Sequence, residues 1–203
     1  MGYGIAVALG YLIGSFNMAY LLSRLKNTEM RDKGSGNLGA SNTTALLGWR
    51  AGVLVCVVDI MKAVLTVLLA RRLFPELLHV GAVAGVAAVL GHIFPFYLNF
   101  RGGKGFASYI GLTIAINWKF ALVLLAVILI VTVVTDYIVC GTVTTIVATP
   151  LYIGYTSHSF LLGLIFSVAT VVILYKHREN FKRIRNRTEI GLHSVLRGEH
   201  RVK

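Results

Sequence analysis

Residues 92–108 read HIFPFYLNFRGGKGFAS and separate two apolar runs of the chain. Three glycines fall within residues 102–105, and Arg101 and Lys104 stand among them. Glycines let a ligand approach the backbone N–H groups closely, and the two cations add fixed positive charge, so this loop favours a phosphate. It is not a Walker A loop, because no glycine stands five residues before the Gly-Lys pair and another glycine follows the lysine. A basic cytoplasmic hairpin between two membrane helices is the alternative.

The composition places most of the chain in lipid. The 203 residues are 56% hydrophobic and 14% charged, with a mean hydropathy of +0.75, and a soluble domain cannot bury so much apolar surface. The net charge of +12 comes from basic residues between and after the apolar runs. We therefore expect membrane lipids and phosphorylated substrates as partners, and no nucleic acid. Cys56 and Cys140 are isolated in apolar runs, which indicates neither a disulfide framework nor a metal site.

Seven apolar segments are candidates for membrane helices. The first has neither the basic start nor the cleavage site of a signal peptide, so we expect it to remain as a helix. The fourth is short, with only 14 residues between Lys104 and Lys119, whereas an upright helix needs about 20. The segments are residues 3–23, 51–70, 80–96, 106–116, 120–134, 138–154 and 160–175.

The distribution of Lys and Arg indicates that the short fourth segment also spans. If it does, the polar regions 24–50, 101–104 and 176–203 share one side and hold 16 of the 20 Lys and Arg residues. If it does not, the basic tail lies opposite the other two regions, which the positive-inside rule disfavours. We therefore predict an all-α integral membrane protein with seven transmembrane helices, the N-terminus outside and the C-terminus cytoplasmic. Residues 1–203 form a single polytopic membrane domain, with 176–203 as a basic cytoplasmic tail.

The first polar region contains a glycine motif, GSGNLG, at residues 34–39. It matches G-x-G-x-x-G, but a dinucleotide-binding fold would need a buried strand before it, and here a membrane helix follows. The segment still offers the Ser35 hydroxyl, the Asn37 and Asn42 amides and bare backbone to a ligand. Alternatively, it is a turn before a short helix at residues 40–47, with Ser35 or Asn37 as the N-cap.

Two polar pairs have helical spacing. Asp59 and Lys62 share one face of the second span. Because ionisable groups in a membrane are costly unless paired or facing a cavity, we expect an intrahelical ion pair, with a direct substrate contact as the alternative. His177 and Asn180 follow the last span and can face one ligand, although such a basic segment is also typical of a lipid head-group anchor. His177 could act as a general base, with Ser35 beside it in a serine-based acyl transfer.

Three segments together resemble the PlsY family of bacterial acyl-phosphate–glycerol-3-phosphate acyltransferases. They are residues 35–42 (SGNLGASN), 91–108 and 177–180 (HREN), which match the order and spacing of the family's three motifs. The resemblance implies transfer of a fatty acyl group from acyl phosphate to the sn-1 hydroxyl of glycerol 3-phosphate, giving lysophosphatidic acid in the first step of phospholipid synthesis. It also implies seven helices in the bacterial inner (cytoplasmic) membrane, an active site facing the cytoplasm, and no cofactor or metal.

The resemblance assigns site residues to all three segments. The catalytic positions are Ser35, Lys104, His177 and Asn180. The expected substrate-binding residues are Gly36, Asn37, Asn42, His92, Arg101, Gly102, Gly103 and Gly105. Acyl phosphate already carries a good leaving group, so the site needs cations for two phosphates, donors for the carbonyl oxygen and an oriented hydroxyl. The base is His177 or a substrate phosphate, and the sequence leaves both open.

The chain departs from the family pattern at several positions. Ala45 stands where the family usually has an arginine, with Arg50 nearby in another register, and residues 106–108 read Phe-Ala-Ser in place of Val-Ala-Thr. Arg187 replaces the glycine before Thr-Glu, and the chain continues beyond the usual stop after Glu189. An acyltransferase-like membrane protein with a different donor or acceptor is therefore one alternative. A transporter of a phosphorylated solute is another, but it would place polar groups near the bilayer midplane and carry repeats.

Overall fold

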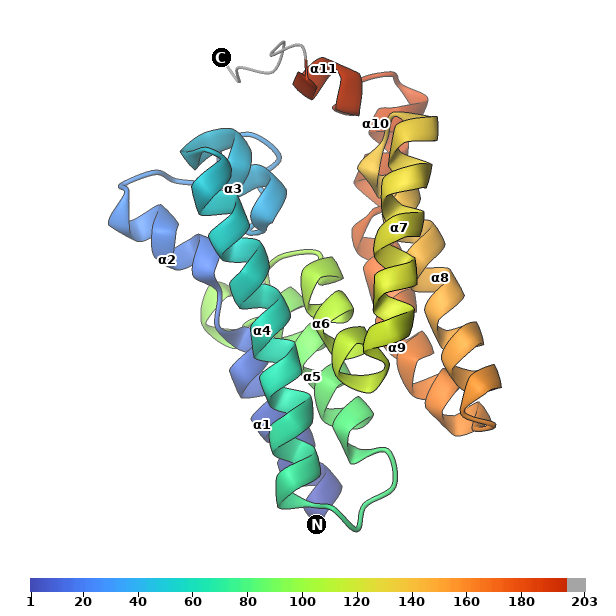
Figure 1. Cartoon of the computed structure of the whole chain (residues 1–203). Helices are drawn as coiled ribbons and strands as arrows, with labels where there is room; N and C mark the ends of the chain where they lie inside the picture. The colour runs from blue at the N-terminus through green and yellow to red at the C-terminus, as the bar shows by residue number, and fades with distance from the viewer. Residues whose placement is uncertain (197–203) are drawn as a thin grey trace. The chain divides into compact units, whose positions relative to one another are not determined.

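The computed structural model describes residues 1–196, and its regular secondary structure there is entirely helical (Figure 1). Its helices form two compact units, one of residues 1–116 and one that begins at Asn117. The first unit contains α1 (Gly2–Ser15), α2 (Met18–Leu25), α3 (Ala40–Leu47), α4 (Trp49–Leu73), α5 (Val80–Ile93), the 3-10 helix η1 (Phe96–Leu98) and α6 (Phe106–Ile116). The second contains α7 (Trp118–Thr135), α8 (Ile138–Thr156), α9 (Phe160–Lys176), α10 (Arg178–Arg185) and α11 (Leu192–Leu196). The end of the predicted basic tail, residues 197–203, lies outside the described residues.

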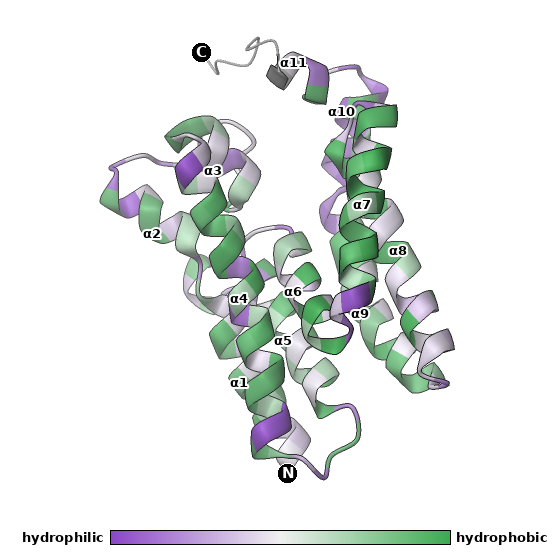
Figure 2. Ribbon diagram, in the orientation of Figure 1, coloured by the Kyte–Doolittle hydropathy of each residue, from purple (hydrophilic) through white to green (hydrophobic). Residues whose placement is uncertain are grey.

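Five helical segments within residues 1–196 are long and apolar enough to cross a membrane, and α9 with α10 makes a sixth if their 42° bend lies within one span. Figure 2 shows hydrophobic residues along most of the length of these helices. α6 is apolar but has only 11 residues, about 16 Å at 1.5 Å per residue against a hydrocarbon core of about 30 Å. The prediction of an all-helical chain is confirmed, whereas the seventh span and the orientation of the termini stay predictions. The five segments are Gly2–Leu25, Trp49–Leu73, Val80–Leu98, Trp118–Thr135 and Ile138–Thr156.

Glycines allow the helices of the first unit to approach closely. A Cβ at Gly14 of α1 would lie 2.0 Å from the Ala88 carbonyl oxygen of α5, and one at Gly91 of α5 would lie 2.2 Å from the Tyr11 carbonyl oxygen of α1. Gly111 of α6 fits against the backbone of α4 in the same way. Small residues at such contacts support helix association in lipid, where the hydrophobic effect does not drive it. These close contacts hold α1 against α5 and α4 against α6.

The first predicted span is interrupted at Asn17, between α1 and α2. The Asn17 side-chain oxygen accepts the Tyr20 N–H at 2.8 Å and so caps α2. Its amide group donates to the Leu38 carbonyl at 3.2 Å, and its backbone N–H donates to the Tyr97 hydroxyl at 3.2 Å. One buried asparagine thus joins the break between α1 and α2 to the loop before α3, through Leu38, and to η1, through Tyr97.

A proline fixes the packing of α8 and α9 in the second unit. Pro150 lies inside α8 and has no N–H to donate to the Ile146 carbonyl four residues earlier. The Thr170 hydroxyl of α9 donates to that carbonyl at 2.9 Å. Gly163 of α9 also lies close to α8, since a Cβ there would be 2.9 Å from the Pro150 carbonyl oxygen. The freed acceptor of one helix therefore becomes a contact with its neighbour.

α10 ends in a left-handed turn at Arg187, whose φ is +55°. The Arg187 N–H donates to the Ile184 carbonyl at 3.0 Å, and the Thr188 N–H donates to the Arg183 carbonyl at 2.8 Å. This is the Schellman pattern of helix ends, in which the left-handed position favours glycine. Arg187 therefore occupies a position where a side chain is least favourable.

We expect Arg187→Gly to stabilise the protein by about 1 kcal/mol, because a left-handed L-residue costs roughly 1–2 kcal/mol and part of that gain is offset by the entropy of glycine. Thermal unfolding in a single detergent measures the change. Arg185→Gly is the matched control, and it should lower stability because Arg185 lies in the last helical turn. An unfolding temperature for Arg187→Gly at or below that of the wild type would contradict the strain.

The segment after Glu189 is held at the α7–α8 turn by Asp136. The Asp136 carboxylate accepts the His193 N–H at 2.8 Å, and the Leu192 N–H donates to the Asp136 carbonyl at 2.7 Å. The hydrogen bond from the His193 N–H is the main reason that the pKa of Asp136 lies below its ordinary value. Because the ionised form is favoured, this contact is fully present above the ordinary pKa of aspartate and is lost as the pH falls through the lowered pKa.

Candidate active site

Asn42 holds the loop between α2 and α3 that carries Ser35. The Asn42 side chain is buried in the first turn of α3. Its oxygen accepts the Ser35 N–H at 2.9 Å, and its amide group donates to the carbonyls of Met30 at 3.1 Å and Lys33 at 3.3 Å. These bonds use one acceptor and both donors of the amide. Asn42 therefore sets the position of Ser35, while its predicted contact with substrate stays a prediction.

The helix predicted at residues 40–47 is present with those bounds as α3, but the predicted N-cap was wrong. Gly39, in an extended conformation, is the N-cap, and it makes no side-chain capping bond. Asn42, three residues further on, instead reaches back to the loop backbone. Ser35 is exposed and Asn37 is half-buried, both outside the helix. The Ser35 hydroxyl is thus not used as a cap.

Apolar side chains anchor this loop in the first unit. Met30 and Leu38 are buried completely or nearly so. They pack in one cluster with Val55 of α4 and Leu98 of η1. Because each end of the Ser35 segment is fixed by one of these side chains, the segment between them is held as a defined loop rather than as a free linker.

The Ser35 loop also contacts the glycine-rich loop directly. Arg31 donates from Nη2 to the Leu98 carbonyl at 2.9 Å and to the Arg101 carbonyl at 3.3 Å. The Leu38 carbonyl oxygen lies only 3.0 Å from where a Cβ at Gly103 would be. The structure therefore brings the first two sequence motifs together within one unit. Arg31 was missed from the sequence, where it was one of several loop cations.

The glycines of residues 102–105 fit the loop against the end of α5. The Gly102 N–H donates to the Ile93 carbonyl at 3.0 Å, and the Gly103 N–H donates to the His92 carbonyl at 3.2 Å. A Cβ at Gly102 would lie 2.0 Å from the His92 carbonyl oxygen, and one at Gly103 would lie 2.0 Å from His92 Nε2. Gly105 has a φ of +91°. The loop conformation therefore requires glycine irrespective of any ligand.

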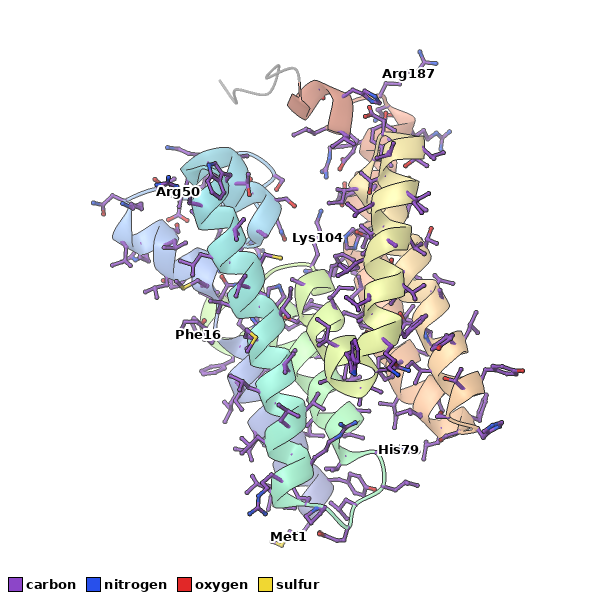
Figure 3. All side chains as sticks on the ribbon, in the orientation of Figure 1. Met1, Phe16, Arg50, His79, Lys104 and Arg187 are labelled. Atoms are coloured by element: carbon purple, nitrogen blue, oxygen red, sulfur yellow. The ribbon has the colours of Figure 1, made fainter. Side chains whose placement is uncertain are left out.

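Positive charge gathers where this loop enters α6. Arg101 is exposed and Lys104 is half-buried. Figure 3 shows the Lys104 side chain extending from the start of α6. The N-terminus of a helix favours anions through its unpaired N–H groups and its dipole. Lys104 and the α6 terminus together suit a phosphate.

His92 lies beneath the loop in a buried polar network. The predicted Asp59–Lys62 pair is confirmed, with 2.8 Å between Lys62 Nζ and Asp59 Oδ1. His92 Nδ1 lies 2.8 Å from Lys62 Nζ and 3.2 Å from Asp59 Oδ1, and Lys62 Nζ also donates to the Phe16 carbonyl at 2.8 Å. His92 is only 3% exposed, so the structure places it in the support of the loop; its predicted contact with substrate stays a prediction.

His177 and Asn180 lie together at the bend between α9 and α10 in the second unit. His177 is buried, and its Nδ1 lies 2.8 Å from the Ile173 carbonyl oxygen. Because a carbonyl oxygen can only accept, Nδ1 carries the hydrogen and the lone pair of the neutral ring is on Nε2. The Asn180 N–H donates to the His177 carbonyl at 2.9 Å. The two residues lie on one helical turn, and their predicted contact with one ligand stays a prediction.

Glu189 holds Asn180, a role that sequence reasoning missed. Its Oε1 accepts from the Asn180 amide at 2.6 Å, and its Oε2 pairs with Arg183 Nε at 2.5 Å. The left-handed turn at Arg187 brings Glu189 back to α10. The Thr-Glu pair was noted in the sequence only as an end of the resemblance. A carboxylate nine residues after an asparagine has no helical spacing that would indicate this contact.

The site residues predicted from the sequence thus form two groups, one in each unit. Ser35, Lys104 and the substrate-binding candidates lie in the first unit, and His177 and Asn180 lie in the second. Ala45 is exposed on α3, which carries no cation, and the Arg50 guanidinium lies 5.5 Å from the centre of the Trp49 ring. Arg50 therefore lies against the Trp49 ring, and nothing in the structure shows it replacing an arginine at position 45.

Comparison with known proteins finds relatives that match nearly the whole chain. The family model for glycerol-3-phosphate acyltransferase matches residues 4–187. Glycerol-3-phosphate acyltransferase 1 of Oceanobacillus iheyensis is 36% identical, over 97% of this chain and 98% of its own length. The glycerol-3-phosphate acyltransferase of Bacillus subtilis is 35% identical, over 91% and 95% of the two chains.

Solved structures agree with these sequence relatives. The crystal structure of PlsY (YgiH), an integral membrane glycerol 3-phosphate acyltransferase, in its glycerol 3-phosphate form has a TM-score of 0.89 at 30% identity, covering 96% of this chain and 98% of its own. Its lysophosphatidic acid form has a TM-score of 0.85, covering 94% and 95%. The resemblance found in the three sequence motifs is confirmed. The chain is an integral membrane acyltransferase and belongs to the glycerol-3-phosphate acyltransferase family.

Proposed function

We propose that the protein transfers a fatty acyl group from acyl phosphate to the sn-1 hydroxyl of glycerol 3-phosphate. A bond forms between the acyl carbonyl carbon and the sn-1 oxygen, and the bond from that carbon to the phosphate oxygen breaks. The electron pair of the broken bond leaves with inorganic phosphate, and the other product is lysophosphatidic acid. The observation that carries the proposal is the packing of the Ser35 loop on the glycine-rich loop, with Leu38 against Gly103, in a chain of this family.

The first unit supplies groups suited to bind phosphate. We assign Arg101, Lys104 and the N-terminus of α6 to the phosphate of glycerol 3-phosphate, with the N–H groups of the first turn of α6 completing the contact. Ser35 exposes a hydroxyl that can donate to the carbonyl oxygen as negative charge develops on it. An acyl-serine intermediate is unnecessary, because the mixed anhydride is already activated towards a positioned hydroxyl.

We assign the roles of a base and of a fixed amide to His177 and Asn180. The lone pair on His177 Nε2 can take the proton of the sn-1 hydroxyl, or orient that hydroxyl while an oxygen of the acyl phosphate takes the proton. Asn180 donates to Glu189 at 2.6 Å, which fixes the direction of its side-chain amide. In the first route, the protonated His177 passes the proton to the departing phosphate, so both routes give lysophosphatidic acid and inorganic phosphate.

The proposed location is the bacterial inner membrane, with seven spans, the C-terminus in the cytoplasm and the site facing the cytoplasm. The basic character of the polar regions around Ser35, Lys104 and His177 supports this orientation. α6, the fourth apolar segment, would be the short span that brings the number to seven. The glycine-rich loop would continue it towards the membrane surface.

An introduced cysteine tests this orientation. Lys182→Cys, in a Cys56→Ala/Cys140→Ala background, should resist an impermeant thiol reagent in intact cells and react after the cells are opened. The Lys182 side chain is 68% exposed, so protection has to come from the membrane and not from burial. Labelling in intact cells would contradict the cytoplasmic C-terminus.

The donor is tested with purified protein. Lysophosphatidate formation is measured with glycerol 3-phosphate and either palmitoyl phosphate or palmitoyl-CoA at equal concentration. We expect product from palmitoyl phosphate and at least about a hundredfold less from palmitoyl-CoA, a difference of about 2.7 kcal/mol in the barrier. Comparable or faster turnover of palmitoyl-CoA would overturn the proposed donor.

Asn42→Ala tests the scaffold of the Ser35 loop. We expect kcat/KM to fall by about 10- to 100-fold, because the loop loses the bonds that position Ser35 while misplaced catalytic groups slow a reaction steeply. Ser41→Ala is the control, since Ser41 is exposed on the neighbouring position of α3 and should leave turnover unchanged. Equal activity of the two variants would show that Asn42 does not position the site.

A further inference from the structure

We infer that the buried Asp59–Lys62–His92 network positions the glycine-rich loop, so that residues buried within α4 set the affinity for glycerol 3-phosphate. This inference rests on the proposed role of that loop in phosphate binding. Asp59 and Lys62 lie outside all three sequence motifs. They act as positioning residues, through His92, and touch no substrate.

Lys62 is fully engaged within the network. Its Nζ lies 2.8 Å from each of three atoms: Asp59 Oδ1, with which it forms an ion pair, the Phe16 carbonyl oxygen, to which it donates, and His92 Nδ1. The network therefore ties α4 to α5 and to the end of α1. His92 Nδ1 faces Lys62 and Asp59, and the other ring nitrogen, Nε2, faces Gly103.

His92 passes this constraint to the loop at two points. Its carbonyl accepts the Gly103 N–H at 3.2 Å. Its ring lies so close to Gly103 that a Cβ there would be 2.0 Å from Nε2. A rotation of the ring or a shift of the His92 backbone would therefore displace Gly103, and Lys104 is the next residue. The network thus reaches the proposed phosphate site through only one intervening residue.

Simple helix adhesion does not require this arrangement. Buried charges in a membrane are costly, and replacing a buried ion pair by apolar residues is often neutral or stabilising. The glycine contacts between α1 and α5 and between α4 and α6 already hold these helices together. What the polar network adds is a directed set of hydrogen bonds that fixes one rotamer of His92 beneath the loop.

A charge-neutral double variant separates positioning from folding. Lys62→Met alone leaves the Asp59 carboxylate without its cation, so Asp59→Asn/Lys62→Met is the main variant. We expect it to fold and to raise the KM for glycerol 3-phosphate by about 10- to 100-fold, while the KM for palmitoyl phosphate stays within about twofold of wild type. If this variant does not fold, Asp59→Asn/Lys62→Gln is measured with the same expectations.

Thr66→Val is the matched control. Thr66 is buried one turn further along α4, and its hydroxyl bonds to the Lys62 carbonyl at 2.7 Å without contact to the loop. We expect both KM values to remain those of the wild type. An increase in the KM for glycerol 3-phosphate equal to that of the double variant would assign the effect to general disturbance of α4 and overturn the inference.

Amide hydrogen exchange tests the loop without using any substrate. The Gly102 and Gly103 N–H groups are bonded to α5 carbonyls, so a peptide covering residues 100–105 should exchange faster in the double variant than in the wild type or Thr66→Val. Unchanged exchange would overturn the positioning role, whatever the kinetics. Faster exchange with a wild-type KM for glycerol 3-phosphate would overturn the link to substrate affinity.

Failure of the proposed function gives a different pattern. If the wild-type protein forms no lysophosphatidate from palmitoyl phosphate, or if Lys104→Ala is fully active, the phosphate-binding role of the loop fails. Faster exchange in the double variant would then still support the positioning of the loop by Asp59, Lys62 and His92. The two claims are therefore separated by one set of variants and two measurements.

Discussion

Lys104→Ala is expected to lower kcat/KM for glycerol 3-phosphate by about 10- to 1,000-fold, equivalent to roughly 1.4–4 kcal/mol of transition-state stabilisation. Lys104 lies between Gly103 and Gly105 in the chain, just before α6 begins at Phe106, where the helix terminus already favours an anion. Removing it takes away the charge that this arrangement presents to a phosphate. Steady-state turnover in detergent, with folding checked by gel filtration, measures the effect.

Two further substitutions show whether charge alone is needed. Lys104→Arg should restore little activity, because a wide planar guanidinium replaces a compact point charge among glycines. Lys119→Ala should leave activity near that of the wild type, since Lys119 is exposed and its ammonium lies 5.8 Å from the centre of the Trp118 ring. Near-normal activity of Lys104→Ala would return the glycine-rich loop to the status of a basic hairpin between membrane helices.

Gly103→Ala is expected to be at least as damaging as the loss of Lys104, although it changes no charge. The added Cβ would lie 2.0 Å from His92 Nε2 and 3.0 Å from the Leu38 carbonyl oxygen. Neither neighbour can move freely, because His92 is held by Lys62 at 2.8 Å and the Leu38 carbonyl by Asn17 at 3.2 Å. The loop must therefore shift, and we expect a loss of about 100-fold or more in kcat/KM.

Gly4→Ala provides the matched control for that substitution. No heavy atom outside its own helix neighbourhood lies within 4 Å of a Cβ at Gly4 in α1, so the added methyl group meets open space. We expect wild-type turnover and, because alanine favours a helix more than glycine does, equal or slightly higher stability. Activity in Gly103→Ala equal to that in Gly4→Ala would contradict the tight fit of the loop on His92.

The helices were predictable from sequence because hydropathy and local spacing determine them. α3 and α6 have the predicted bounds, and the other apolar segments lie within a few residues of theirs. The Asp59–Lys62 pair and the shared turn of His177 and Asn180 were also predictable, since residues three apart on a helix share a face. The three motifs indicated the family, which the comparisons confirm.

The contacts that build the site join residues far apart in the sequence, and for that reason spacing could not give them. Arg31 donates to the Leu98 carbonyl 67 residues away, and Lys62 to the Phe16 carbonyl 46 residues away. The resemblance offered His92 as a substrate ligand because His92 lies in the second motif, but nothing local in the sequence placed it against Lys62. The predicted N-cap failed because the Asn42 side chain satisfies the loop backbone from inside α3.

The proposed reaction is transfer of an acyl group from acyl phosphate to glycerol 3-phosphate, and product stoichiometry tests it most directly. Purified protein is given palmitoyl phosphate with and without glycerol 3-phosphate, and inorganic phosphate, lysophosphatidate and free palmitate are measured together. We predict that phosphate release depends on glycerol 3-phosphate, with one lysophosphatidate formed for each phosphate released and no free palmitate. Release of phosphate with free palmitate in place of lysophosphatidate, or independently of glycerol 3-phosphate, would contradict the account.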